Sequence, residues 1–197
     1  RNYCAEGRIP DAFLTGKTWN VPENAVKPGR TKKQQNAPRN LLEFLRAEKA
    51  SGMKGGIYHK VQIDLTYNSN HIEGSRLTHD QTRYIFETNT IGITDDKGGT
   101  VNVDDVVETA NHFRCIDMVI GQADKQISES FIKELHRTLK NGSSDSRKSW
   151  LAVGDYKKLP NEVGGIETAA PEEVAGRIQE QLRNYNKDKK KTLEDIL

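Results

Sequence analysis

The stretch TYNSNHIEGSRLT, residues 66–78, decides how the rest of the chain is interpreted, because it combines reactive side chains with a helix end. It predicts the last turns of a helix that stops at Gly74, since glycine readily accepts the left-handed backbone that follows a helix. On such a helix Ser69 and Glu73 share a face, whereas His71 lies about 200° round from each. A serine–histidine–acid relay needs the histidine between its partners, so these residues do not form one.

Two other interpretations of this stretch can be compared. His71, Glu73 and His79 lack the i, i+4 histidine spacing of a zinc-binding helix, which disfavours a metal site. An exposed histidine and an exposed glutamate at a helix end are the simpler alternative. A carboxylate there faces the negative end of the helix dipole, at a cost of up to about 1 kcal/mol. Glu73 is therefore expected to need a cationic partner, and none is obvious nearby in the sequence.

Outward from this stretch, the periodicity of apolar residues predicts a mainly α protein. In the helix that carries the stretch, the apolar positions are Ile57, Val61, Leu65 and Ile72. Thr78 and Gln81 have the spacing of a capping box, which predicts the start of the next helix. Helices are predicted from Leu41 to Ser51, from Ile57 to the stop at Gly74, from Thr78 to about Thr88, over 103–119, from Ser128 to Asn141, from Pro171 through Leu182, and from Thr192 onward, with a turn at 95–99.

One segment, SWLAVGDYKKL at 149–159, interrupts the helical pattern. It is rich in strand-forming residues, has Gly154-Asp155 in its middle and ends before Pro160, which predicts a two-stranded hairpin. Two strands alone are marginally stable in water, so this hairpin is expected to lean on the helices or to receive a partner strand.

The N-terminal part differs in composition from the rest. Residues 1–28 predict a helix end, a turn at EGRIP and a strand at KTWNVP, too little to form a core. Residues 29–39 are polar and basic without hydrophobic periodicity, which predicts a linker. Residues 1–33 carry seven basic and three acidic residues, a weak indication of contact with DNA.

Composition sets limits on the class of protein. Of the 197 residues, 34% are apolar and 29% charged, which indicates a folded, polar helical protein rather than a disordered one. No apolar run reaches the roughly 20 residues of a membrane-spanning helix, and the first residues of the sequence do not have the pattern expected of a signal peptide. We expect a cytoplasmic bacterial protein without membrane contact. Because the chain starts at Arg1, we also expect it to be a piece of a longer protein.

The opening stretch resembles the inhibitory motif (S/T)xxxE(G/N) of Fic-domain proteins, with Ser69, Glu73 and Gly74 at the defined positions. The segments LTHDQT, VNVDDVVETANHF, IKELHRTL and WLAVGDYKKLPNEVGGIETAAPEEV follow in the family's order, so the resemblance covers residues 40–197. It implies a Fido-type helical bundle with one β-hairpin, the flap. Residues 1–28 are similar to part of a winged helix-turn-helix module, a small α/β fragment often found ahead of such domains.

The resemblance implies a protein adenylyltransferase, which moves AMP from ATP to a hydroxyl of a target protein or of itself. In this family the signature HPFxxGNGRxxR supplies the general base, the phosphate-binding backbone and the acid that holds Mg²⁺. That signature does not occur in the 197 residues. We therefore expect no catalytic residues and no bound ATP or Mg²⁺ in this chain alone, and expect the signature beyond Leu197.

Site residues follow from the resemblance as expectations. Glu73 is expected to pair with the second arginine of the missing signature and so to block the ATP γ-phosphate, with Ser69 bracing it. The flap is expected to take up a target segment as an added strand. Its predicted residues are Trp150, Leu151, Ala152, Val153, Gly154, Asp155, Tyr156 and Lys157.

Two alternatives stay open. The chain is a DNA-binding regulator whose helical part dimerises, or it is a separate inhibitory partner of a Fic enzyme. Salt-dependent binding to duplex DNA would distinguish a DNA-binding regulator from the other two interpretations. The target protein, self-association into a homo-oligomer, and AMP addition versus removal are not decided by the sequence.

Overall fold

The computed structural model describes residues 2–5, 7–28, 40–91 and 100–187, and it divides the chain into two compact units, Arg1–Ala37 and Pro38–Leu197. The predicted linker at 29–39, the turn at 95–99 and the helix from Thr192 lie outside the described residues. Within the described residues, no helix combines the length and the apolar content that crossing a membrane requires.

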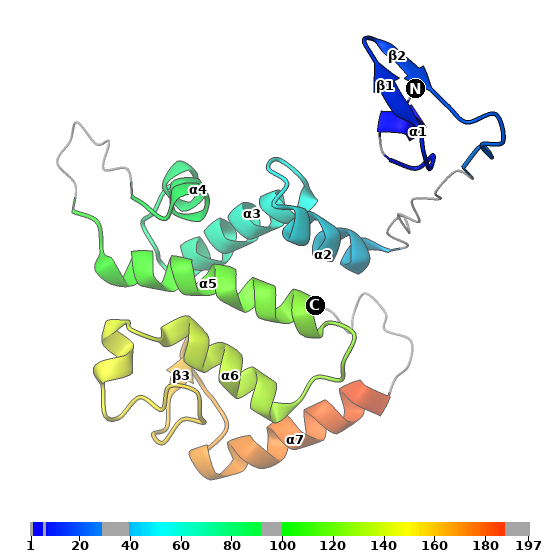
Figure 1. Ribbon diagram of the computed structural model, residues 1–197. Helices are drawn as coiled ribbons and strands as arrows, with labels where there is room; N and C mark the ends of the chain where they lie inside the picture. The colour runs from blue at the N-terminus through cyan, green and yellow to red at the C-terminus, as the bar shows by residue number, and fades with distance from the viewer. Residues whose placement is uncertain (1, 6, 29–39, 92–99, 188–197) are drawn as a thin grey trace. The chain divides into compact units, whose positions relative to one another are not determined.

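The N-terminal unit contains a short helix and a hairpin (Figure 1). Helix α1 spans Asn2–Ala5, and strands β1 (Phe13–Thr15) and β2 (Thr18–Asn20) pair antiparallel with Leu14 opposite Trp19. Strand β2 confirms the strand predicted at KTWNVP. Cys4 is the only buried hydrophobic residue among those described here, and Phe13 and Leu14 are exposed. The unit therefore has almost no core, as its length predicts.

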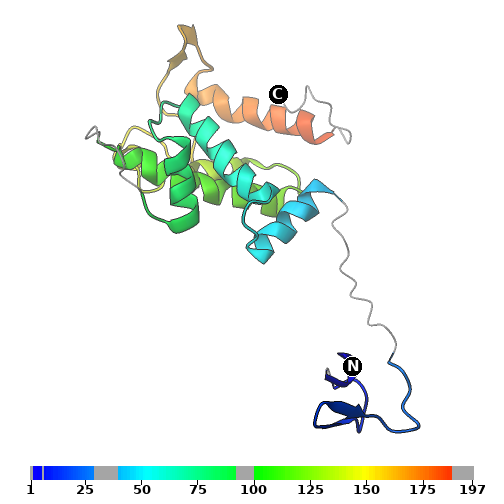
Figure 2. The same cartoon turned by 90° about the horizontal axis from the view of Figure 1, so that it is seen from above.

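The second unit is a helical bundle arranged around one long helix (Figure 1). Its helices are α2 (Leu41–Ser51), α3 (Ile57–Ile72), α4 (His79–Thr88), α5 (Val103–Gln122), α6 (Glu129–Lys140) and α7 (Pro171–Lys187), with a 3₁₀ turn at Ser144–Arg147. Helix α5 lies between α3 and α6, and it also contacts α2 and α4. Helix α7 packs beside α6 (Figure 2). The mainly α fold is thus confirmed.

The helix ends follow the local signals in the sequence. Thr78 and Gln81 form the predicted capping box at the start of α4, and the Ser128 side chain accepts the backbone N–H of Phe131 at the start of α6. Gly52 closes α2 with a φ of 64°, the left-handed conformation that glycine adopts without strain. These ends agree with the predicted ones to within a few residues.

Two hydrophobic clusters form the core where α5 meets the helices that precede it in the chain. Leu45, Ile116 and Ile120 are buried between α2 and α5. Leu77, Ile85 and Phe113 are buried where α4 meets the first half of α5. On α6 and α7 no residue is fully buried, so the core is confined to the α2–α5 half of the unit.

The side of α3 that is buried differs from the side that its apolar residues suggest. Ile57, Leu65 and Ile72 are exposed, whereas Gln62 and Thr66 are completely inaccessible to solvent. Polar residues are buried on this side of α3 because the partner helix α5 presents polar groups to it. The helix itself was predicted correctly.

The hairpin predicted at 149–159 is wrong, since these residues form turns and irregular backbone. The hairpin lies further on, where β3 (Glu162–Val163) pairs antiparallel with β4 (Ile166–Glu167). Gly164 and Gly165 connect the strands with φ angles of 59° and 79°, the two positive values that a two-residue type I′ turn requires. In Figure 2 this hairpin stands away from the helices, beyond the first turn of α7.

Candidate functional site

A ladder of polar side chains joins α3 to α5 and sets the position of the end of α3. Four residues of α3 at a spacing of four, Tyr58, Gln62, Thr66 and Asn70, face α5. Their contacts are Tyr58 Oη to Asp117 Oδ1 at 2.8 Å, Gln62 Nε2 to Asp117 Oδ1 at 2.9 Å, Thr66 Oγ1 to His112 Nδ1 at 2.9 Å, and Asn70 Nδ2 to Thr109 Oγ1 at 2.9 Å. Because hydrogen bonds are directional, this ladder determines the register of α3 along α5.

Two titratable groups in this ladder have altered acidity. Burial, together with the hydrogen bond to Asp117, raises the pKa of Tyr58 to about 12, so its hydroxyl remains a donor at neutral pH. Burial lowers the pKa of His112, which keeps this ring neutral at pH 7. The ladder therefore consists of neutral donors and acceptors around one carboxylate, Asp117.

The end of α3 carries the predicted motif. The backbone N–H of Glu73 donates to Ser69 O at 3.3 Å, that of Gly74 to His71 O at 3.1 Å, and that of Ser75 to Asn70 O at 2.9 Å. Gly74 has a φ of 94°, which a side chain would disfavour, and it ends the helix as predicted. Glu73 is exposed and Ser69 is half-buried.

Ser69 and Glu73 line one pocket of about 450 Å³ between the end of α3, the start of α5 and the end of α6. The other residues of its wall are Asn70, Ile72, Ser75, Asp105, Glu108, His112, Leu139 and Lys140. The structure thus brings the two motif residues together, although no hydrogen bond joins their side chains. Asp105, Glu108, His112 and Lys140 were missed at the sequence level, because only the packing of α5 and α6 against α3 gathers them.

The pocket has an excess of negative charge. It contains the carboxylates of Glu73, Asp105 and Glu108, and its one lysine, Lys140, is already paired with Glu108 at 2.8 Å and with Asp145 at 3.1 Å. Burial opposes the charge on Lys140, but these two partners raise its pKa overall. Among the described residues, Glu73 forms no ion pair. The cationic partner predicted for this carboxylate is therefore not supplied by the described part of the chain.

No cluster of three or more histidine, cysteine, aspartate or glutamate side chains in the described part of the chain is arranged to hold a metal ion. The carboxylates of the pocket thus do not fit a Mg²⁺ site.

The residues predicted as the flap, 150–157, lie against α6. Gly154 is buried, and its N–H donates to His136 Nδ1 at 3.2 Å while its carbonyl accepts from Arg137 Nη2 at 3.2 Å. Lys133 pairs with Asp155 at 3.0 Å and lies 4.1 Å from the centre of the Tyr156 ring. Trp150 is exposed, Leu151, Ala152, Val153 and Lys157 are half-buried, and none of the eight residues is in a strand. The segment is attached to α6 and is not a free edge.

Gly154→Ala is expected to loosen this attachment. A Cβ at this position would lie 2.7 Å from Arg137 Cβ, and the backbone φ is 73°. Strain and overlap together should lower the opening free energy of the segment by about 2 kcal/mol, or roughly 30-fold in the rate of cleavage. Tryptic cleavage after Lys148 and Lys157 measures this rate. Gly164→Ala is the control, since it adds similar strain in open space, and equal cleavage of both variants would contradict the attachment.

Comparison with known proteins shows a likeness to solved structures. No protein-family model matches the sequence, and no curated protein matches it. The crystal structure of a Fic domain-containing signaling protein from Bacteroides thetaiotaomicron is similar to this chain, with a TM-score of 0.55 and 27% sequence identity. This chain has a Fic-type fold. The match covers 74% of this chain and 55% of the other, so the chain spans little more than half the length of that Fic protein.

The motif at the end of α3 lies beside α5 and α6. Ser69 and Glu73 line one acidic pocket together with residues of these two helices. The hairpin β3–β4 lies at the far end of the polypeptide segment that follows α6. These two features are the candidate sites of the chain.

Proposed function

We propose that this chain is the regulatory and target-docking part of a Fic-family protein adenylyltransferase, in which Glu73 restrains the transfer of AMP from ATP to a protein hydroxyl. The observation that carries this proposal is the Glu73 carboxylate, which lines an acidic pocket at the end of α3 and has no ion pair among the described residues. The resemblance to Fic proteins in motif order and the Fic-type fold support it.

The chemistry of inhibition is that of a charge-assisted pair. An arginine from a catalytic loop outside these 197 residues would find three carboxylates at the pocket, and it would form its strongest contact with the unpaired Glu73. An arginine held in this way does not contact the ATP γ-phosphate, so ATP would bind in a pose that does not react. Ser69, one turn earlier, lines the same wall and would limit the orientations of Glu73.

The catalytic loop would supply the groups that bind ATP and Mg²⁺. In the described part of the chain no group of histidine, cysteine, aspartate or glutamate side chains is arranged to hold a metal ion. When bound, ATP and Mg²⁺ would supply the transferred AMP and the neutralisation of its phosphates. The role of this chain is to keep the arginine away from the ATP γ-phosphate and to position the target segment.

Glu73→Gly in the complete protein is expected to increase AMP transfer. Removal of a charge-assisted contact of about 1.5–3 kcal/mol corresponds to a rise of roughly 10-fold to 100-fold. The measurement is incorporation of AMP from ATP labelled at the α-phosphate, into the enzyme itself or a target. Glu73→Gln tests the charge alone and should also raise transfer.

The matched control is Glu134→Gln, an exposed glutamate of α6 outside the pocket. It should leave the rate unchanged. If Glu73→Gly and Glu134→Gln give the same rate as the unsubstituted protein, Glu73 has no inhibitory role.

A further inference from the structure

The turn of residues 73–76 (the Glu73 turn) is not fixed in shape by the packing of side chains. Glu73 and Gly74 are both exposed, and a Cβ placed on Gly74 would meet no atom within 4 Å beyond its chain neighbours. A glycine in open space with a φ of 94° gives the backbone a freedom that a packed residue lacks. Hydrogen bonds therefore have to hold the Glu73 side chain in one place.

Backbone hydrogen bonds close this turn as a Schellman motif. The N–H of Gly74 donates to His71 O at 3.1 Å, and the N–H of Ser75 donates to Asn70 O at 2.9 Å. Glu73 is the last residue before the left-handed glycine, so the direction of its side chain depends on this closure. Asn70, which accepts the outer of the two bonds, couples the Glu73 turn to the body of α3.

Helix α5 holds the turn from both sides. Before the turn, the side-chain amide of Asn70 donates to Thr109 Oγ1 at 2.9 Å. Within its last residue, the N–H of Arg76 donates to Asp105 Oδ2 at 2.9 Å. Asp105 and Thr109 are four residues apart and share one side of α5. These two hydrogen bonds form a clamp on the Glu73 turn.

The two halves of the clamp differ in burial. Thr109 is 1% exposed, so its bond to Asn70 is shielded from water, whereas Asp105 is half-buried. One turn further along α5, Phe113 lies in the same buried cluster as Leu77, the residue that follows the Glu73 turn. The turn is thus suspended between two fixed points on one side of α5.

The clamp leaves the Glu73 carboxylate free. Asp105 accepts the N–H of Arg76, and Glu108 is paired with Lys140 at 2.8 Å. Of the carboxylates that line the pocket, that of Glu73 is the one without a hydrogen bond or ion pair in the described part of the chain. A carboxylate held through its backbone and not through its own oxygens is preorganised for an incoming cation.

We propose that Asn70, Asp105 and Thr109 are positioning residues, which clamp the Glu73 turn onto α5 and hold its carboxylate where it takes up the arginine. The inference deepens the proposed function and rests on it for the inhibitory role of Glu73. A loosened clamp would leave Glu73 chemically intact but spread over several orientations. Its contact with the arginine would then weaken in proportion to the population lost from the inhibiting orientation.

The first measurement is hydrogen exchange of single backbone amides in the 197-residue chain, followed by NMR. Thr109→Val removes the hydroxyl that accepts from Asn70, and Asp105→Ala removes the oxygen that accepts from Arg76. Each is expected to speed exchange of the Ser75 and Arg76 amides by about fivefold to tenfold, as the loss of one hydrogen bond predicts. Thr109→Ser and Asp105→Asn keep an accepting oxygen and should keep exchange slow.

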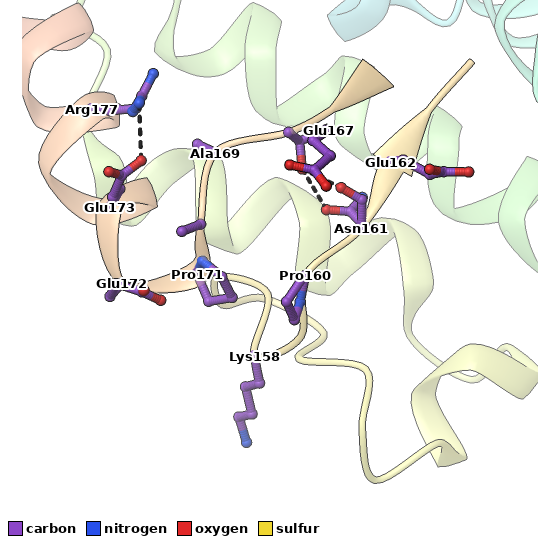
Figure 3. Close-up of a pocket in the computed structure, with 12 residues that line it drawn as sticks. Lys158, Pro160, Asn161, Glu162, Glu167, Ala169, Pro171, Glu172, Glu173 and Arg177 are labelled. Atoms are coloured by element: carbon purple, nitrogen blue, oxygen red, sulfur yellow. Dashed lines mark hydrogen bonds and ion pairs between the residues drawn. The ribbon is translucent and has the colours of Figure 1, made fainter. Parts of the chain in front are cut away.

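Glu173→Ala is the matched control for Asp105→Ala. Both carboxylates lie in the first turn of a helix, and Glu173 also has a partner, Arg177 at 2.9 Å, as the dashed line in Figure 3 shows. Glu173 lines a separate pocket of about 820 Å³ beside the hairpin β3–β4 and not the Glu73 pocket (Figure 3). Its removal should leave exchange in the Glu73 turn unchanged.

The second measurement is AMP transfer by the complete protein, because a merely structural role would not produce the expected pattern. Thr109→Val should raise transfer by about threefold to tenfold, and Thr109→Ser should keep the low rate. In a Glu73→Gly background Thr109→Val should have no further effect, since no carboxylate remains to be positioned.

The proposal is overturned if exchange in the Glu73 turn stays slow in Thr109→Val and Asp105→Ala. It is also overturned if Thr109→Val fails to raise transfer, or raises it equally in the absence of Glu73. Amide exchange needs neither ATP nor the catalytic loop. If Glu73→Gly by itself leaves transfer unchanged, the proposed function has failed, and the positioning role falls with it even where exchange confirms the clamp.

Discussion

Asn111→Asp is expected to lower the free energy of unfolding of the helical unit by about 2–4 kcal/mol, because it removes two buried donors at once. Asn111 is 4% exposed, and its side-chain amide donates to Leu139 O at 3.0 Å and to Asn141 O at 2.8 Å. The last carbonyls of a helix have no partner within the helix. A carboxylate at this position would present negative charge to both carbonyls in place of two N–H groups.

The loss of stability in Asn111→Asp arises at the contact between α5 and the C-terminal end of α6. Ser143, which is fully buried, caps the neighbouring carbonyl of Lys140 through its hydroxyl at 2.8 Å, so the side chains of Asn111 and Ser143 together satisfy this helix end. Urea unfolding followed by circular dichroism at 222 nm measures the loss. Asn68→Asp, an exposed substitution on α3, is the control and should change stability by no more than about 0.5 kcal/mol. A loss for Asn111→Asp as small as that of the control would contradict the capping role.

Gly56→Ala is expected to destabilise the same unit by about 1–3 kcal/mol, since it displaces a side chain that caps α3. Gly56 precedes α3 and offers no side-chain cap. Glu48 of α2 takes this role: it is 6% exposed, and its Oε2 accepts the N–H of Tyr58 at 2.7 Å. A Cβ on residue 56 would lie 2.5 Å from that oxygen. The carboxylate would have to leave the helix N-terminus, where the dipole also favours it.

A double-mutant cycle separates this mechanism from a general effect of the methyl group. In a Glu48→Ala background the clash no longer exists, so Gly56→Ala should cost much less there, with a coupling of about 1 kcal/mol or more. Gly121→Ala is the matched control: it lies within α5 with open space around it, and it should stabilise the unit by about 0.5–1 kcal/mol. Additive costs in the cycle would show that Glu48 is not the group displaced.

The candidate site could be predicted from the sequence only in part. Ser69 and Glu73 were identified because they lie four residues apart before a glycine, which is a local pattern. Half of the pocket wall comes from residues 30 or more positions away, such as Asp105 and Lys140, which no local pattern connects to Glu73. For the hairpin, the Gly164-Gly165 pair between β-branched residues was an available signal for the turn. Gly154 was chosen instead, but its left-handed backbone serves the contact with His136 and Arg137.

Helix positions and helix ends follow from residues that are close in the chain, because a capping box or a C-terminal glycine acts within one turn. The sequence therefore predicts the start of α4 from Thr78 and Gln81, and the ends of α2 and α3 from Gly52 and Gly74. Which side of a helix is buried depends on what its neighbour presents. On α3, Gln62 and Thr66 are buried and Leu65 is exposed, because Asp117 and His112 of α5 provide the hydrogen bonds that make polar burial favourable. Only the packed helices could decide this, since those partners lie about fifty residues away.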